Sequence, residues 1–238
     1  MPSTDLRLIL HQIGNLAQPI AYHVEKLAEI RSDDPTFNAA MKALPERMAV
    51  FNRTIDRLRI LAKPVELELG RVDLCALLKS VWNDVSNEKP FKSIKVKWNF
   101  GAPASSRLEA GAPVQGDSYW LHLALRELLL NAAEAAAQSA SPAVEIQVSA
   151  KDKNWRIEIN DSGPGLPAEA ALGALFFTAK ADTAAGLGLP IARHILDAHG
   201  GTLLFEPHGL GAAKVRAKSA AVAVAGDRCH VAVLLPQA

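Results

Sequence analysis

The sequence predicts an α+β protein of two domains. Two long amphipathic segments open the chain, and a stretch that mixes helical and alternating patterns follows them. The length of 238 residues fits two domains better than one or three. We expect a helical domain at residues 1–65 and a mixed domain at residues 66–238.

A long amphipathic helix is expected over residues 5–31. Apolar residues recur there at alternating steps of three and four, which places them in one seam along the helix. The seam consists of Leu6, Ile9, Ile13, Leu16, Ile20, Val24 and Leu27. The pattern then breaks, and the next residues suit a new helix, with Asp34 as its N-cap and Pro35 in its first turn.

A second helix is expected from there to about Ala62, and Pro45 should kink it or mark its true start. Its stripe consists of Met41, Leu44, Met48, Phe51, Ile55 and Leu58. Two helices joined by a short loop form an antiparallel hairpin, which cannot bury both stripes alone. We therefore expect a homodimer with a four-helix bundle, although any helical dimerisation module would show this pattern.

The mixed domain is expected to begin after Lys63-Pro64. The expected helices are Asp73–Val85, Tyr119–Ala137 and Pro190–His199, the last ended by Gly200-Gly201. The expected strands are Ile94–Phe100, Val144–Val148, Trp155–Ile159, Val215–Val224 and His230–Leu235. Residues 101–116, rich in Gly, Ala, Pro and Ser, are expected to form a loop.

The composition excludes several classes of protein. The formal net charge of +1 gives no electrostatic reason to expect nucleic acid as a partner. The two cysteines show neither metal spacing nor a disulfide framework. No signal peptide is visible, and no run reaches the roughly 20 apolar residues that span a bilayer. We expect a cytoplasmic protein with no integral membrane segment.

Asp161 ends an expected strand and is followed by Ser-Gly-Pro-Gly, a tight turn that needs glycine. A carboxylate held there, beside bare backbone, can accept a hydrogen bond from an adenine amino group. The same residues also make an ordinary turn, so this segment alone leaves both interpretations open.

Glu127 and Asn131 are four residues apart on an expected helix and therefore share a face. An asparagine oxygen can ligate Mg²⁺, and a glutamate one turn earlier can orient or deprotonate a nucleophile near a γ-phosphate. A solvated polar face is the alternative, but apolar residues flank Asn131 on both sides.

Gly186-Leu-Gly-Leu189 precedes an expected helix. Glycines at a helix start expose backbone N–H groups to an anion, and Lys180 could add a positive charge. A plain junction between a loop and a helix is the alternative.

In this order, the segments resemble the ATP-binding domain shared by histidine kinases, DNA gyrase, Hsp90 and MutL. Glu127 to Glu134 look like its N box, Asp161 to Gly165 its first glycine box, and Phe176 to Lys180 its F box. Gly186 to Leu189 look like the second glycine box, and His199-Gly200-Gly201 sits where histidine kinases carry His-Gly-Gly. The resemblance implies an α/β sandwich of Bergerat type.

The resemblance, which covers about residues 66–206, also implies ATP and Mg²⁺ as cofactors. Asp161 would bind the adenine amino group, Gly163 and Gly165 would allow close backbone approach, and Asn131 would hold Mg²⁺. The remaining cofactor-binding residues expected, in a lid over the phosphates, are Phe177, Thr178, Lys180, Gly186, Leu187, Gly188 and Leu189.

His11 lies on the first expected helix. A neutral imidazole can attack a phosphoryl group, although a lone histidine on a helix seldom does so. A helical hairpin ahead of an ATP domain resembles the phosphotransfer domain of sensor histidine kinases. Its motif is His, then Glu or Asp, with Asn or Thr in fifth place, which His11 and Asn15 match and His23 does not.

Gln12 departs from this motif. It can accept the imidazole hydrogen bond but brings no charge, which should weaken His11 as a nucleophile by ~10²-fold. Asn15 would still orient water to dephosphorylate a partner. Further departures are Glu134, where many kinases have a basic residue, and Ala184, which replaces the first glycine of the second box.

The sequence therefore predicts a homodimeric histidine kinase that phosphorylates itself from ATP and passes the group to the receiver domain of a response regulator. Its expected catalytic residues are His11, Gln12, Asn15 and Glu127. Gln12 favours an alternative, an ATP-binding phosphatase or scaffold with weak or no kinase activity. Glu127 suggests a stand-alone ATPase as a third. Residues 209–226 extend beyond the usual family pattern and receive no role.

Overall fold

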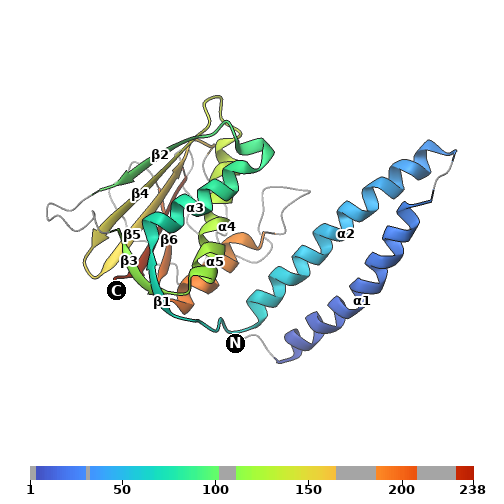
Figure 1. The fold of residues 1–238 in the computed structure, drawn as a ribbon, viewed down its shortest axis with the longest axis horizontal. Helices are drawn as coiled ribbons and strands as arrows, with labels where there is room; N and C mark the ends of the chain where they lie inside the picture. The colour runs from blue at the N-terminus through green and yellow to red at the C-terminus, as the bar shows by residue number, and fades with distance from the viewer. Residues whose placement is uncertain (1–3, 31–32, 102–110, 165–185, 208–228) are drawn as a thin grey trace. The chain divides into compact units, whose positions relative to one another are not determined.

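The structure is a computed structural model that describes residues 4–30, 33–101, 111–164, 186–207 and 229–238 (Figure 1). It divides into two compact units. One unit contains the chain up to Pro64, and the other begins at Val65. Within the described ranges, none of the helices is both long and apolar enough to cross a membrane.

The first unit consists of α1 (Thr4–Ala28) and α2 (Pro35–Ala62), which pack along one another. The expected start of α2 is confirmed, because the Asp34 side chain accepts a hydrogen bond of 2.8 Å from the backbone N–H of Thr36. Pro45 lies inside α2 and does not mark its start.

The apolar seam of α1 is only partly buried in this unit. Ala17 and Val24 are buried, whereas Ile20 is 52% exposed and Leu27 is 43% exposed. On α2, Phe51 is 41% exposed. One pair of helices therefore covers part of its own apolar surface and leaves the rest uncovered.

The second unit contains a five-stranded mixed sheet in the order β2-β4-β5-β7-β6. Its strands are β2 (Lys95–Phe100), β4 (Ala143–Lys151), β5 (Asn154–Asp161), β7 (Cys229–Pro236) and β6 (Thr202–Pro207). β2 and β4 are parallel, and the other neighbours are antiparallel. Together with the helices, this mixed sheet confirms the α+β class.

Two short strands outside the large sheet lie where the sequence analysis expected none, and so does β6 within it. Pro113–Gly116 is strand β3 and pairs antiparallel with β1 (Gly70–Asp73) in a small separate sheet. The expectation of a loop over all of residues 101–116 is therefore wrong at its end. Each strand has only four residues, and glycine and proline at their ends hide any alternation. The expected strand Val215–Val224 lies outside the described residues.

Three helices lie side by side over one face of the large sheet (Figure 1). They are α3 (Leu74–Asn87), α4 (Ser118–Ala136) and α5 (Gly188–Ala198), and a single 3₁₀ turn, η1 (Lys89–Phe91), follows α3. Ile157, Ile159 and Asp161 are buried and lie two residues apart along β5, so they share the face beneath α4. α5 ends at Ala198, two residues before Gly200, whose φ of 68° suits glycine, as expected.

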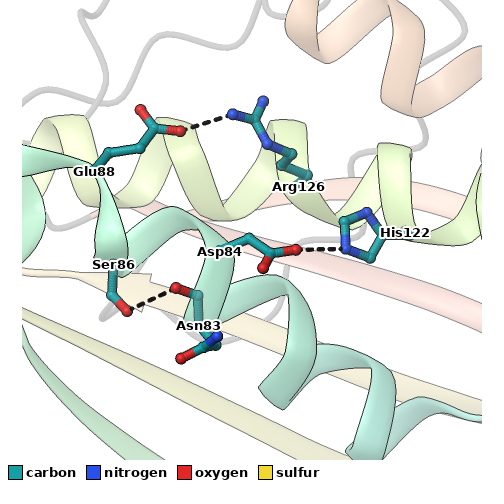
Figure 2. Close-up of polar contacts among 6 residues, drawn as sticks. All are labelled: Asn83, Asp84, Ser86, Glu88, His122 and Arg126. Atoms are coloured by element: carbon teal, nitrogen blue, oxygen red, sulfur yellow. Dashed lines mark hydrogen bonds and ion pairs between the residues drawn. The ribbon is translucent and has the colours of Figure 1, made fainter.

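Two ion pairs join the exposed sides of α3 and α4 (Figure 2). Asp84 and His122 approach to 3.0 Å, and Glu88 and Arg126 approach to 2.7 Å. Exposed pairs of this kind contribute at most about 1 kcal/mol each, so the packing of α3 on α4 depends mainly on its apolar residues.

Asp117 is the N-cap of α4 and also fixes the entry to the second unit. Its Oδ1 accepts hydrogen bonds from the backbone N–H groups of Tyr119 and Trp120, at 3.0 and 3.2 Å. Its Oδ2 accepts a third, of 2.9 Å, from the N–H of Glu68. One buried carboxylate therefore satisfies three backbone donors.

The backbone N–H of Asp117 donates to Nε2 of His199, just after the last turn of α5, at 3.0 Å. Nδ1 of His199 lies 2.8 Å from the carbonyl oxygen of Ile195. A carbonyl only accepts, so the geometry assigns a ring proton to Nδ1. The start of α4 and the end of α5 are thereby joined through one imidazole ring.

Burial alone would raise the pKa of Asp117, but the N–H groups of Glu68, Trp120 and Tyr119 and the nearby His199 together hold it below its ordinary value. A lowered carboxyl pKa stabilises the folded state at pH values above the pKa of the unfolded chain. This stabilisation is lost as pH falls through the pKa of the folded state.

We expect Asp117→Ala to lower the free energy of unfolding by about 2–4 kcal/mol, because a cap is lost and buried donors lose their acceptor. Denaturant titration near neutral pH measures this loss. Asp197→Ala, an exposed change on α5, is the control and should have little effect. Equal stability of the two variants would contradict the central role of Asp117.

Candidate functional site

One face of α4 carries three positions spaced four residues apart, which are Glu127, Asn131 and Ala135. Four residues make slightly more than one helical turn, so these positions form a line along the helix. Glu127 is 4% exposed although it is acidic, and Asn131 is half-buried. A polar line in this setting indicates a site and not a solvated surface.

Gly188, the first residue of α5, lies against the first two of these positions. A Cβ at Gly188 would be 2.7 Å from Oε2 of Glu127 and 3.5 Å from Nδ2 of Asn131. The start of a helix presents unpaired N–H groups and the positive end of its dipole. Glycine here allows that end of α5 to approach the polar line of α4 closely.

The turn after β5 lies against the third position. Gly163 donates its N–H to Oδ1 of Asp161 at 2.8 Å. A Cβ at Gly163 would be only 2.7 Å from the backbone C and O of Ala135. Ser162 fixes the turn to β4, because it exchanges two hydrogen bonds with Ala143, of 2.9 and 3.0 Å. The glycine is needed because the turn packs directly on the backbone of α4.

Asp161 is 6% exposed, and burial raises its pKa, opposed in part by the hydrogen bond from Gly163. Among the residues that the structure describes, Oδ2 of Asp161 has no hydrogen-bond partner. An acceptor held in a buried place without its own donor suits the amino group of a purine ring. The carboxylate therefore fits the role expected for it.

The structure brings the expected residues Glu127, Asn131, Asp161, Gly163 and Gly188 to one side of the sheet, along one helix face. Glu127 and Asn131 lie beside the start of α5, and the turn after β5 holds the Asp161 carboxylate.

The structure describes some of the other expected positions and not the rest. Gly186, with a φ of 63°, and Leu187 lead into α5, and Leu189 follows Gly188 in its first turn. His11 and Gln12 lie within α1, where Asn15 is exposed. The expected residues Gly165, Phe177, Thr178 and Lys180 lie outside the described residues, as does Ala184.

Sequence reasoning missed two parts of this arrangement. Asp117 precedes α4 as an obvious cap, but nothing in the sequence showed that His199 would contact it. The sequence identified His199 only as part of a motif. Ala135 contributes through its backbone, and its spacing from Asn131 was the signal that could have placed it on the same line.

Residues 116–234 match the family described as histidine kinase-, DNA gyrase B-, and HSP90-like ATPase. The match spans half of the chain and includes every element of the site described above. The chain belongs to this family, and the resemblance recognised from the sequence is confirmed.

Similar proteins include sensor histidine kinases. Sensor histidine kinase ZraS of Escherichia coli K12 is 28% identical over 198 residues, which are 82% of this chain and 40% of ZraS. Sensor protein FixL of Bradyrhizobium diazoefficiens is 36% identical over 113 residues, 46% of this chain and 22% of FixL. ZraS is a sensor histidine kinase, the class expected from the sequence. The chain spans about two fifths of the length of ZraS.

Solved structures show the same fold. Full-length ShkA in complex with AMPPNP has a TM-score of 0.69 at 21% identity, covering 100% of this chain and 46% of ShkA. Acinetobacter baumannii histidine kinase AdeS has a TM-score of 0.60 at 17% identity, covering 95% of this chain and 98% of AdeS.

The two site glycines should respond differently to alanine. Gly163→Ala should lower the free energy of unfolding by about 1–3 kcal/mol, because its Cβ meets the backbone of Ala135. Gly188→Ala should lower the free energy of unfolding by less than Gly163→Ala does, because its Cβ meets the movable end of the Glu127 side chain.

Denaturant titration of both variants tests this difference. Gly70→Ala is the control, since a Cβ there meets nothing within 4 Å. A loss at Gly163 no larger than the loss at Gly70 would show that the turn does not rest on α4 as described.

Proposed function

We propose that this chain is the kinase core of a two-component system. ATP binds in the second unit, its γ-phosphoryl group is transferred to His11, and an aspartate of a response regulator then receives it. The observation that carries the proposal is the buried Asp161 carboxylate with an open acceptor, next to a glycine that packs on α4. The sensor histidine kinases among its relatives support it.

The base end of ATP is recognised at the turn after β5. Oδ2 of Asp161 accepts a hydrogen bond from the adenine amino group, while Oδ1 is held by Gly163. Because the carboxylate is nearly dry, this bond is worth more than one made in water. The turn itself is fixed by Ser162 and Ala143, so the acceptor is held in place before ATP binds.

The phosphate end is bound between α4 and the start of α5. Asn131 holds Mg²⁺ through its amide oxygen, and the ion, when bound, offsets negative charge on the phosphates. The N–H groups at the start of α5 attract phosphate oxygens. Glu127, beside Gly188, orients or deprotonates the attacking group.

In the transfer step, the unprotonated ring nitrogen of His11 attacks the γ-phosphorus. The bond from phosphorus to the β–γ bridging oxygen breaks, and its electron pair leaves with ADP. The proton on the other ring nitrogen is then released to a base. Gln12 can accept a hydrogen bond from that nitrogen without adding charge.

A second copy of the chain covers the open part of the hairpin. Ile20, Leu27 and Phe51 are large apolar residues on α1 and α2 that stay exposed in one copy. Two such hairpins bury these residues in a four-helix bundle. The receiver domain of the response regulator binds near His11 on the same bundle.

A second function is favoured by Gln12, which brings no charge to His11. The chain then binds ATP without phosphorylating itself and acts as a phosphatase or scaffold for the response regulator, with Asn15 orienting water. ATP binding without label on His11 would support this alternative over the kinase.

Asp161→Asn should weaken ATP binding by about 10- to 100-fold, because a hydrogen bond to a charged acceptor becomes one to a neutral acceptor. Calorimetric titration with ATP and Mg²⁺ measures this change. Asp152→Asn, in the exposed turn between β4 and β5, is the matched control. Unchanged affinity in Asp161→Asn would remove the proposed site.

The ATP-free Asp161→Asn protein should be at least as stable as the wild type at neutral pH. Because the folded pKa of Asp161 is raised, its contribution to stability is present below the unfolded pKa and is lost as pH rises through the folded pKa. The free energy of unfolding of Asp161→Asn should therefore lack this dependence on pH.

His11→Ala should abolish transfer of label from γ-labelled ATP to the protein, because the acceptor nitrogen is lost. The label should be acid-labile, as a phosphorus–nitrogen bond is. His23→Ala, an exposed change three turns further along α1, is the matched control and should keep the label. Label that survives in both variants would exclude His11 as the acceptor.

A further inference from the structure

Gly14 of α1 lies where an arginine of the other helix comes unusually close. A Cβ at Gly14 would be 1.8 Å from Nη2 of Arg59, 2.8 Å from its Cζ and 3.6 Å from its Nε. The Arg59 guanidinium therefore occupies the space that any other side chain at position 14 would need. Gly14 is buried by this contact although it lies on a two-helix hairpin.

Close packing of the two helices does not account for this glycine. The three atoms nearest to the missing Cβ all belong to the Arg59 guanidinium, and none belongs to the backbone of α2. Glycine weakens a helix interior relative to alanine. Its presence here makes room for a positive charge and not for a neighbouring helix.

Two ordinary roles for Arg59 also leave the contact unexplained. Arg59 lies in the last turn of α2, where a basic residue interacts well with the helix dipole, but this needs no glycine on α1. Its Nη1 pairs with Oδ1 of Asp56 at 3.0 Å, with 38% and 68% of the two side chains exposed. A pair this exposed adds little stability, so Asp56 mainly orients the guanidinium.

The guanidinium lies one turn from His11. Positions 11 and 14 share a face of α1, and Cβ atoms three residues apart on a helix are about 5–6 Å from each other. Nη2 of Arg59 nearly coincides with the Cβ position at residue 14. It therefore lies on the face of α1 that positions 11 and 14 share.

We propose that Arg59 binds the phosphoryl group carried by His11, and that Gly14 is the gap that admits it. The proposal rests on the proposed function, since it needs His11 as the phosphoryl acceptor. A guanidinium is always charged and presents a planar fork of donors that fits phosphate oxygens. Asp56 holds one edge of this fork, and the other edge lies over Gly14.

Arg59 offsets charge that arrives with the phosphoryl group. Phosphorus forms its bond to the ring nitrogen as the bond to the bridging oxygen of ATP breaks, and the three equatorial oxygens stay negative throughout. Binding these oxygens stabilises the phosphorylated chain relative to the free chain. The equilibrium between ATP with free His11 and ADP with phosphohistidine therefore shifts towards phosphohistidine.

Two variants remove the cation from this place in different ways. Arg59→Met keeps a long helix-forming side chain without charge. Gly14→Ala keeps every charge but displaces the guanidinium, whose flexible end can move aside at little cost to the fold. Arg53→Met, which removes another exposed arginine of α2, is the matched control.

The full chain is incubated with labelled ATP, ADP and Mg²⁺, and the fraction labelled on His11 is measured at equilibrium beside the thermal midpoint of unfolding. Arg59→Met and Gly14→Ala should each lower the ratio of phosphohistidine to free histidine by about 10- to 100-fold. Arg53→Met should give the same ratio as the wild type, and Arg59→Lys should give a ratio between those of the wild type and Arg59→Met. High salt should reduce the differences in this ratio among the variants.

Wild-type labelling in Arg59→Met would overturn the proposal. A second pattern would also overturn it. If Arg59→Met lowers both the labelling of His11 and the thermal midpoint, while Gly14→Ala labels normally, then Arg59 has a structural role. Label that survives His11→Ala, or no label at all, would overturn the proposed function itself. In that case phosphoramidate, which phosphorylates histidine without an enzyme, replaces ATP, and equal loading of the wild type and Arg59→Met at His11 would overturn the role of Arg59.

Discussion

The hydrogen bond from the backbone of Asp117 to the His199 ring is the constraint on which the site depends. It joins the start of α4 to the end of α5 across 82 positions of sequence. α4 and α5 are neighbours that pack along each other, so fixing them at one end sets their alignment at the other. At that other end, Gly188 reaches Glu127 and Asn131. The polar groups of the site therefore depend on a contact between the far ends of the same two helices.

Asp117 and Asp161 are both buried carboxylates of the second unit, but they differ in how many hydrogen-bond donors each receives. Asp117 receives three backbone donors, and its pKa is lowered despite burial. Asp161 receives one donor, and burial raises its pKa. Natural proteins rarely leave a buried acceptor underused without a use for it. The second oxygen of Asp161 therefore remains open to a donor, as the proposed binding of adenine requires.

The sequence predicted most helices well because their apolar spacing and caps are local features. Asp34 and the glycine after α5 marked helix ends correctly, and Asp161 was placed at a strand end. The short strands β1, β3 and β6 were missed, since four to six residues with glycine or proline at an end carry little periodic signal. The site residues on α4 could be named from spacing alone. Their closeness to Gly188 and the Asp117–His199 contact could not, because both join segments distant in sequence.

At three glycines of this chain, a neighbouring group occupies the space that a Cβ would need. The three positions differ in which group this is. At Gly163 it is the backbone of Ala135, which cannot move, so the glycine is a condition of the fold. At Gly188 it is the Glu127 carboxylate, and at Gly14 it is the Arg59 guanidinium, both at the ends of flexible side chains. A fold does not require glycine beside a movable group, because that group can turn aside. Glycine at these two positions leaves room for the charged end of a neighbouring side chain, and this is the arrangement on which both proposals rest.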